Sequence, residues 1–305
     1  MENLNIIICG VVKNCRLKLD NNIRLAIETG KLFNTYKIVI YENNSTDGTK
    51  EVLQNYKSNP YFKIISEDID YDKIKSDSKI WTYTEITGSD APCRIEQICN
   101  SRNKVIEEIN SAEYERFNYV IWIDLDSNGW LPQGIINSFY QSDKWDIVYA
   151  NGIDNNKNYY DLYAYRGQNQ LFGPEIIGEV FWTNMRQLQF NNNMLLPVYS
   201  AFGGIGIFKK NIFKTYKYDC IVNDAVKYYY YNLLSNISLP DNIINCIKNI
   251  DYKFPSGYMD KNNSIFWKSN SGYKQPVVCE HVCLNLSLIN NGYKIYINPK
   301  MIYFR

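Results

Sequence analysis

The sequence predicts an α/β protein in which helices cover a mostly parallel sheet, folded as a single composite domain. Three observations support this fold class. Short apolar runs alternate with helical patterns through the first half of the chain, which is the signature of α/β layering. The chain has 305 residues, of which 45% are hydrophobic, so it can bury a sizeable core. No linker rich in Pro or Ser divides the two halves, and the sequence contains no internal repeat.

Four apolar runs in the first half are expected to form strands. They are Leu4 to Val12, Tyr36 to Glu42, Tyr61 to Ser66 and Tyr119 to Asp126. The first run is continuously apolar, which is typical of a strand buried on both faces. The carboxyl end of the fourth run, "YVIWIDLD", is where open α/β sheets place their ligands.

Helical patterns separate these strands. Ile23, Ala26 and Ile27 mark one face of a helix after the first strand. After the second strand, "NNSTDGTKEVLQNY" offers Ser, Thr and Asp as N-caps for the next helix. In "RIEQICNSRNKVIEEI" the apolar residues recur on one stripe, so Arg102 is expected to lie near that stripe and not opposite it.

The segment Glu67 to Pro92 breaks this alternation and is expected to form a long loop near the ligand crevice. In the second half, "WDIVYANG" and "NYYDLYAYR" predict strands, and "SAFGGIGIFKK" predicts a Gly-rich strand. The last motif, "CEHVCLNLSLINNGYKIYINP", predicts a helix, a glycine stop and a final strand.

Charge and cysteine content exclude several classes of protein. Lys+Arg 33 against Asp+Glu 32 gives a net charge of +1, so no nucleic-acid partner is expected. The 8 cysteines are scattered and form no CxxC pair, which favours free thiols in a reducing compartment. The apolar run near the N-terminus is too short for a signal or membrane segment. We therefore expect a soluble, cytoplasmic chain without a transmembrane segment.

Asp124 and Asp126 stand one residue apart at the end of the fourth strand. Two such residues within a strand would point to opposite faces, but past the end of the strand both can reach one ligand. Carboxylates suit magnesium or manganese, whose shell diphosphate oxygens commonly complete. A bound dication would stabilise the charge of a leaving nucleoside diphosphate. An Asp-x-Asp pair alone is also compatible with a solvated turn.

Four segments in order give the chain a resemblance to the glycosyltransferases of GT-A fold. "IVIYENNSTDGTKEVL" is similar to the "vivDDgStDgT" segment of that family, and "CNSRNKVIE" to its "aRN" helix. "YVIWIDLDSNGWLP" resembles the Asp-x-Asp strand, and "EHVCLNLSLINNGYKIYINP" tracks "EDvdlglRlrkaGyrivyvP". More narrowly, "DIVYANGID", "YYDLYAYR", "AFGGIGIFKK" and "CEHV" resemble a branch near the capsule-type mannosyltransferases.

The resemblance implies a GT-A-like, Rossmann-type sheet with an appended acceptor-binding half. Residues 1–126 would form the nucleotide-binding half, and residues 127–305 the half that holds donor sugar and acceptor. The implied reaction is the metal-dependent transfer of a sugar, most simply a hexose, from a UDP- or GDP-linked donor to the hydroxyl of a glycan, protein or lipid-linked acceptor. Mn²⁺ or Mg²⁺ is the implied cofactor.

The resemblance also implies roles for individual residues. Val12, Glu42, Arg102 and Asp124 would bind the donor nucleotide, with Arg102 neutralising phosphate or bracing the acids. Glu42 could equally cap the following helix, and Arg102 could form an ordinary ion pair.

Two further groups of residues carry expectations of the same kind. Gly203 and Gly204 would let the backbone approach the donor sugar or acceptor, or they could mark only a tight turn. The run Tyr228 to Tyr231 could stack on acceptor sugars, although packing explains such a run as well.

The family's Glu-Asp pair reads Glu280-His281 here, and His281 is the only histidine in the chain. The resemblance implies that His281 joins Asp124 and Asp126 as a metal ligand, since many members supply a late histidine to the metal. Glu280 would then be the catalytic base in an inverting enzyme, or an acceptor-positioning residue in a retaining one. A zinc site with Cys279 and Cys283 is disfavoured because His281 would point away from their helix face.

Two other functions stay open from the sequence. A nucleotidyltransferase shares the layering and the acidic metal site, but "CGVVKNCR" lacks a convincing Gly-rich loop. A non-catalytic sugar- or nucleotide-binding protein on the same fold would make the Glu-His change a mark of lost chemistry.

Overall fold

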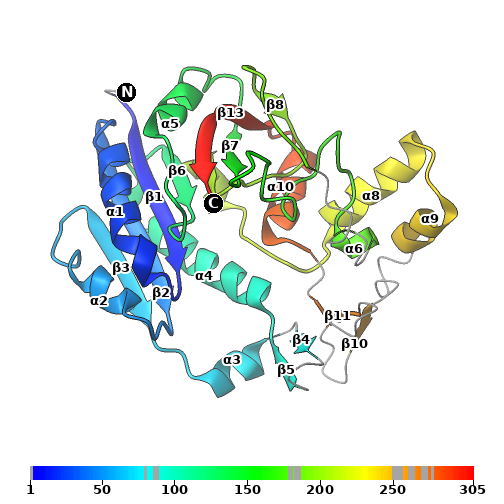
Figure 1. The fold of residues 1–305 in the computed structure, drawn as a ribbon, viewed down its shortest axis with the longest axis horizontal. Coiled ribbons are helices and arrows are strands. Elements are labelled where there is room, and N and C mark those ends of the chain that lie inside the picture. Colours follow the sequence, from blue (N-terminus) through cyan, green and yellow to red (C-terminus); the bar gives the residue numbers. More distant parts are fainter. Residues whose placement is uncertain are drawn as a thin grey trace.

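The computed structural model describes residues 3–78, 81–84, 89–177, 181, 187–248, 257–259, 265–268, 274–275 and 278–305. Its main sheet is built from β1 (Asn5–Val12), β2 (Thr35–Asn43), β3 (Phe62–Glu67), β6 (Tyr119–Ile123), β7 (Ile147–Ile153), β8 (Leu196–Pro197), β9 (Ile205–Lys209) and β13 (Ile295–Phe304). The strand order is β3-β2-β1-β6-β9-β7-β13-β8 (Figure 1).

Most neighbouring strands of this sheet are parallel. β1 pairs with β2 and β6, β2 with β3, and β13 with β7, all in parallel. β9 runs antiparallel between β6 and β7 and so joins the two halves of the chain in one sheet. The predicted mostly parallel α/β sheet is therefore confirmed. Its consequence for function is that the carboxyl ends of β1, β2 and β6 meet at one edge.

Helices pack on both faces of the sheet. They are α1 (Arg16–Gly30), α2 (Thr49–Gln54), α3 (Tyr71–Asp77), α4 (Arg94–Ile109), α5 (Pro132–Phe139), α6 (Pro174–Ile177), α8 (Asp224–Asn236), α9 (Asp241–Lys248) and α10 (Glu280–Asn290). α1, α2 and α5 contribute to one hydrophobic core, and α4, α8 and α10 to the other. The apolar stripe of α4 faces the sheet as predicted, and it takes Arg102 into the interior, where this residue is 3% exposed.

A second, smaller sheet corrects the predicted loop over residues 67–92. Asp70 caps α3 by accepting the N–H of Asp72, and β4 (Trp81–Thr84) pairs with β5 (Ser89–Pro92). The sheet continues through β10 (Gly257–Met259), β11 (Ile265–Lys268) and β12 (Lys274–Gln275), in the order β10-β11-β12-β4-β5. Because these partners are distant in the chain, local pattern could not reveal the pairing. Residues 79–80 and 85–88 of the predicted loop lie outside the described residues.

The strand predicted for "NYYDLYAYR" is wrong. The segment makes two isolated bridges, Tyr159 with Ile153 and Arg166 with Ser200, and it turns between them. The buried Arg166 guanidinium explains the turn, because it donates to the carbonyl oxygens of Tyr163 and Tyr165 and so curls the chain around itself. The N-cap of α2 also differs from prediction, since Gly48 occupies it with a φ of 93°.

The structure bears on two expectations, the lack of a membrane-spanning segment and the free state of the cysteines. Among the described residues, none of the helices combines the length and apolarity needed to cross a bilayer. Cys9, Cys15, Cys93, Cys99, Cys220, Cys279 and Cys283 are free thiols, while the Cys246 side chain lies outside the described part.

Candidate active site

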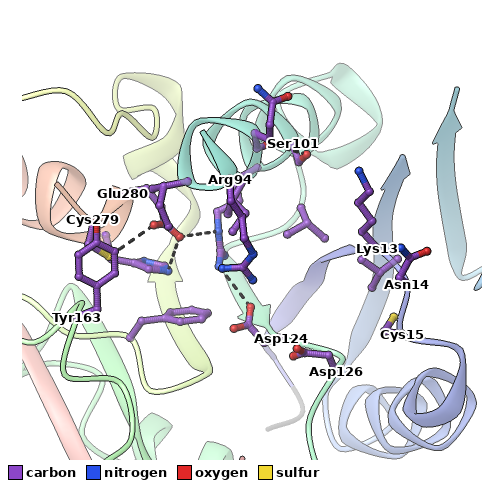
Figure 2. A pocket seen from close by; sticks show the side chains of 18 of the residues that line it. Lys13, Asn14, Cys15, Arg94, Ser101, Asp124, Asp126, Tyr163, Cys279 and Glu280 are labelled. Atoms are coloured by element: carbon purple, nitrogen blue, oxygen red, sulfur yellow. Dashed lines mark hydrogen bonds and ion pairs between the residues drawn. The ribbon is translucent and has the colours of Figure 1, made fainter. Parts of the chain in front are cut away.

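A cavity of about 670 Å³ opens where β1 and β6 end, which is the edge of the sheet that the sequence predicts for ligands. Figure 2 shows Cys279 and Glu280 on one side, Lys13 and Cys15 on the other, and the two acids between them. Of the predicted site residues, the cavity is lined by Val12, Arg102, Asp124, Asp126, Glu280 and His281. Glu42, Gly203 and Gly204 do not line it.

The turn that carries the acid pair is held from three sides. The Asp124 N–H donates to the Gly204 carbonyl, and the Tyr303 hydroxyl donates to the Asp124 carbonyl, each at 3.0 Å. The buried Asn22 amide, on α1, donates to the carbonyl oxygens of Leu125 and Ser127. Because the backbone is fixed here, both carboxylates are presented to the same cavity.

Arg102 links two of the acids. Its Nη2 lies 3.3 Å from Asp124 Oδ1, and its Nε lies 3.6 Å from Glu280 Oε1. The guanidinium is sandwiched by aromatic rings, with the Phe202 centroid at 4.8 Å and the Trp122 centroid at 5.2 Å. Arg102 therefore joins α4, β6 and α10 in one charged cluster, and the fixed positive charge is buried at its centre.

The carboxylates of this cluster repel one another. Burial raises the pKa of Asp124 to about 7, with Arg102 opposing the shift and the charges of Asp126, Asp161 and Glu280 adding to it. Asp124 therefore keeps its proton to a higher pH in the ligand-free chain than an ordinary aspartate does. A positive ligand that binds here would drive off that proton.

Asp161 is the main residue that sequence reasoning missed. It lines the cavity from the turn after β7, and its Oδ2 accepts the Gly203 N–H at 3.1 Å. Burial raises its pKa to about 6; backbone hydrogen bonds from Gly203 and Ala164 oppose this, and the Glu280 charge adds to it. The signal was present in "YYDLYAYR", a segment of the resemblance, but reading it as a strand gave its acid no role.

Arg305 is a second missed residue. Its Nη1 lies 2.8 Å from Asp126 Oδ1, and its guanidinium lies 5.7 Å from the Tyr160 ring centroid. The two paired residues are 179 positions apart in sequence and meet only because β13 ends beside the turn after β6. No local pattern in the sequence could have indicated the contact.

α10 begins at the cavity with the Glu280-His281 pair. His281 Nε2 lies 3.6 Å from Glu280 Oε1, and the imidazole stacks on Phe202 with centroids 3.9 Å apart. Among the described residues, neither ring nitrogen has a hydrogen-bond partner, although His281 is only 2% exposed. Burial and the Arg102 charge lower the pKa of His281, so the ring is neutral and has a lone pair available.

The end of the cavity beside β1 lacks the clustered acids. It includes Val12, the residues 13–15 that follow β1, and Asn43 at the end of β2. Glu42 is fully buried, and its Oε1 accepts the Ser45 N–H at 2.7 Å while Oε2 accepts the Ser66 hydroxyl. One carboxylate oxygen therefore holds the turn after β2 and the other holds β3, and contact of Glu42 with a nucleotide stays a prediction.

Gly203 and Gly204 shape the site without entering it. Their φ angles are +62° and +85°, in the left-handed region that favours glycine. A Cβ on Gly203 would lie 2.4 Å from the Ala150 carbonyl oxygen, and one on Gly204 would lie 2.2 Å from the Tyr303 ring. In this structure the pair lets the backbone reach Asp161 and Asp124. Of the Tyr228 to Tyr231 run on α8, the middle two rings are buried and the outer two are exposed.

The residues around the acid pair fit a divalent cation in charge and donor type. Carboxylate oxygens repel one another there, and His281 offers an unpartnered neutral nitrogen. Within the described part of the chain, no three His, Cys, Asp or Glu side chains already form a metal-binding group. A cation held by only one or two carboxylates takes its other ligands from water and substrate phosphate, as magnesium sites commonly do.

The family model described as cryptococcal mannosyltransferase 1 matches residues 19–255 of the chain. A comparison with curated proteins found no match. Solved structures with a distant likeness include S. aureus TarS 1–349, with 9% sequence identity and a TM-score of 0.43 over 99% of this chain and 60% of that one.

Two other solved structures show likenesses of similar strength. GalNAc-T7 with UDP, GalNAc and Mn²⁺ has 11% identity and a TM-score of 0.44, covering 99% of this chain and 44% of that one. Glucosyl-3-phosphoglycerate synthase from Mycobacterium tuberculosis with UDP has 9% identity and a TM-score of 0.37, covering 90% and 91%. The chain thus spans less than two thirds of TarS 1–349 and of GalNAc-T7.

Proposed function

Because the chain belongs to the cryptococcal mannosyltransferase 1 family and is therefore a glycosyltransferase, we propose that it transfers a hexose from a nucleotide-diphosphate sugar to an acceptor hydroxyl. Family membership agrees with the resemblance that the sequence carries. Mannose is the first sugar to test, since it is the sugar in the family's description. The donor is UDP- or GDP-linked, and the acceptor is a glycan or another hydroxyl compound.

One observation carries the proposal most directly. A cavity at the carboxyl ends of β1 and β6 combines an end without acids beside Val12, Lys13 and Asn43 with an end of clustered acids and a buried arginine. A nucleoside would suit the first end and a diphosphate linked to a sugar the second. The halves 1–126 and 127–305 meet at this cavity, in keeping with a division between nucleotide and sugar.

The proposed reaction breaks the bond between the anomeric carbon and the diphosphate oxygen. The leaving electron pair goes to the diphosphate, the acceptor oxygen bonds to the anomeric carbon, and its proton passes to a carboxylate. Arg102 would stabilise negative charge near the leaving group, because its buried guanidinium cannot be deprotonated. Aromatic rings on both sides hold that charge in place before substrate arrives.

Asp124, Asp126 and His281 would hold Mn²⁺ or Mg²⁺. When bound, the cation supplies positive charge to the diphosphate as it leaves. Asp126 is the more accessible of the two carboxylates, with 46% of its side chain exposed. Asp124 would lose its proton when the cation binds. The Tyr303 and Gly204 contacts keep the Asp124 backbone in position during this change.

Glu280 is the proposed proton acceptor, and Asp161 is its rival. Glu280 forms an ion pair with Arg102, and its Oε2 accepts from the Cys279 thiol at 3.5 Å. Asp161 accepts backbone hydrogen bonds from Gly203 and Ala164, and its raised pKa suits proton transfer near neutral pH. Whichever of the two does not take the proton would position the sugar hydroxyls.

The test is a donor screen followed by an activity assay. Thermal shift with UDP and GDP, each with Mn²⁺ or with EDTA, should identify the nucleobase of the donor. A ligand at a hundredfold excess over its Kd stabilises the fold by about 2.7 kcal/mol. Incubation with the matching nucleotide sugar should then release nucleotide slowly through transfer to water. Binding without any release would contradict catalysis and favour a sugar-binding protein.

A further inference from the structure

Arg305 and Asp126 form an ion pair at the mouth of the cavity, where both residues line it. The side chains are 43% and 46% exposed, so water reaches both charges. Exposed ion pairs of this kind contribute little to stability, because solvent screens them and the side chains lose freedom. The pair can therefore open when a ligand offers either partner a better contact.

The backbone of Arg305 is fixed even though its side chain is exposed. Its N–H donates to the Ile153 carbonyl, and its own carbonyl accepts from the Asn128 side chain at 2.8 Å. The preceding residue, Phe304, donates its N–H to the Gly129 carbonyl. These bonds attach the end of β13 both to β7 and to the turn that follows Asp126. The position of β13 therefore places the Arg305 side chain at the cavity.

The charges around the ion pair favour a change of partner by Arg305. Asp126 belongs to a cluster of carboxylates that also contains Asp124, Asp161 and Glu280, and Asp124 feels the charges of the other three. Arg305 is the second guanidinium in contact with this cluster, after Arg102. Phosphate offers a guanidinium two oxygens and more negative charge than one carboxylate does. A diphosphate at the acid pair would therefore compete for Arg305.

We propose that Arg305 is a diphosphate-binding residue that covers Asp126 in the ligand-free chain and moves from it to the nucleotide diphosphate. The inference rests on the proposed function, because it requires a nucleoside diphosphate in the cavity. Two consequences have opposite signs. Without nucleotide, Arg305 competes with a cation for Asp126 and weakens metal binding. With nucleotide, Arg305 adds a charge-assisted hydrogen bond and strengthens nucleotide binding.

The experiment compares wild type with Arg305→Gln by titration calorimetry. Mn²⁺ alone should bind Arg305→Gln roughly two- to fivefold more tightly, the gain expected from removing one exposed ion pair. UDP or GDP in EDTA, whichever wild type prefers, should bind Arg305→Gln about tenfold or more weakly, because a charged hydrogen bond is lost. Lys300→Gln is the matched control, since it removes an exposed charge from the same strand and should change neither affinity.

Other outcomes separate the possible failures. Unchanged Mn²⁺ and nucleotide affinities in Arg305→Gln would make the pair a surface contact and overturn the inference alone. Weakening of both affinities with a lower melting temperature would make Arg305 structural, and it would overturn the inference as well. Arg305→Lys keeps the charge without the fork, so it should restore Mn²⁺ binding to the wild-type level and nucleotide binding only in part. A wild-type chain that binds neither UDP nor GDP would contradict the proposed function itself.

Discussion

Asp161 should make the stability of the protein fall as pH rises from 5 to 7, and Asp161→Asn should abolish that part of the fall. The folded-state pKa is about 6, against an ordinary value of 3.8. At pH 5 the folded chain therefore holds a proton that the unfolded chain has largely released. The stabilisation from that proton is present below the folded pKa and is lost as pH rises through it.

The two pKa values give the size of the effect. Linkage predicts a contribution of about 1.4 kcal/mol to the free energy of unfolding at pH 5 and of about 0.1 kcal/mol at pH 7. Wild type should thus lose about 1.3 kcal/mol over this interval that Asp161→Asn does not lose. The asparagine oxygen can still accept the Gly203 N–H, so the local fold is retained. The raised pKa of Asp124 also makes stability depend on pH, but wild type and Asp161→Asn share this contribution, so it cancels to first order in the comparison.

Urea denaturation of both proteins at pH 5 and pH 7 measures this difference directly. Asp143→Asn serves as the control for general loss of negative charge, because Asp143 is exposed and lies outside the cavity. Parallel pH profiles for wild type and Asp161→Asn would refute the argument, since they would mean that Asp161 is an ordinary solvated acid. If Asp161 and not Glu280 takes the acceptor proton, turnover should also rise as pH increases through 6, and Asp161→Asn should lack that rise.

Three further predictions concern the predicted ligands and the base. Asp126→Asn should fold normally, because its ion-pair partner Arg305 is exposed, and it should lose the Mn²⁺-dependent share of nucleotide affinity. Calorimetry with Mn²⁺ and with EDTA measures that share, and an unchanged effect of Mn²⁺ would contradict the prediction. His281→Ala should weaken Mn²⁺ and nucleotide binding together and lower the melting temperature, since the ring packs on Phe202. A lower melting temperature with unchanged Mn²⁺ affinity would end the ligand assignment. Glu280→Gln should spare donor binding and lower turnover to acceptor by about 10²–10⁴, the usual range for a lost general base, as initial rates at saturating donor would show.

Sequence pattern was sufficient for the elements whose burial is regular. The four strands of the first half and the apolar stripe of α4 follow from local periodicity, because the sheet and its helices bury most of the apolar residues that the pattern marks. The placement of Asp124 and Asp126 at one cavity also follows, since a strand end is a local feature and its edge of the sheet is set by parallel pairing.

Contacts between distant segments were beyond that reasoning. Arg305 reaches Asp126 only through the path of β13, and Asp161 faces the cavity only because Arg166 curls its segment away from the strand that alternating tyrosines predict. Glu42 shows the opposite limit: the resemblance implies nucleotide contact, but the structure pairs its two oxygens with the turn after β2 and with Ser66 on β3. Each case depends on a partner that local sequence does not specify.

Charge balance explains why nucleotide and cation should bind together. Asp124, Asp126, Asp161 and Glu280 interact with one another, and Arg102 and Arg305 are the guanidiniums in contact with them. The ligand-free chain relieves the excess of negative charge in part by keeping protons on its acids, as the raised pKa values of Asp124 and Asp161 indicate. A diphosphate that arrived alone would add to this excess, whereas a dication that arrived alone would have to displace Arg305 from Asp126. When the two arrive together, the cation neutralises the carboxylates and the diphosphate takes Arg305. Each ligand thereby removes the electrostatic cost of the other, which is the condition for cooperative binding.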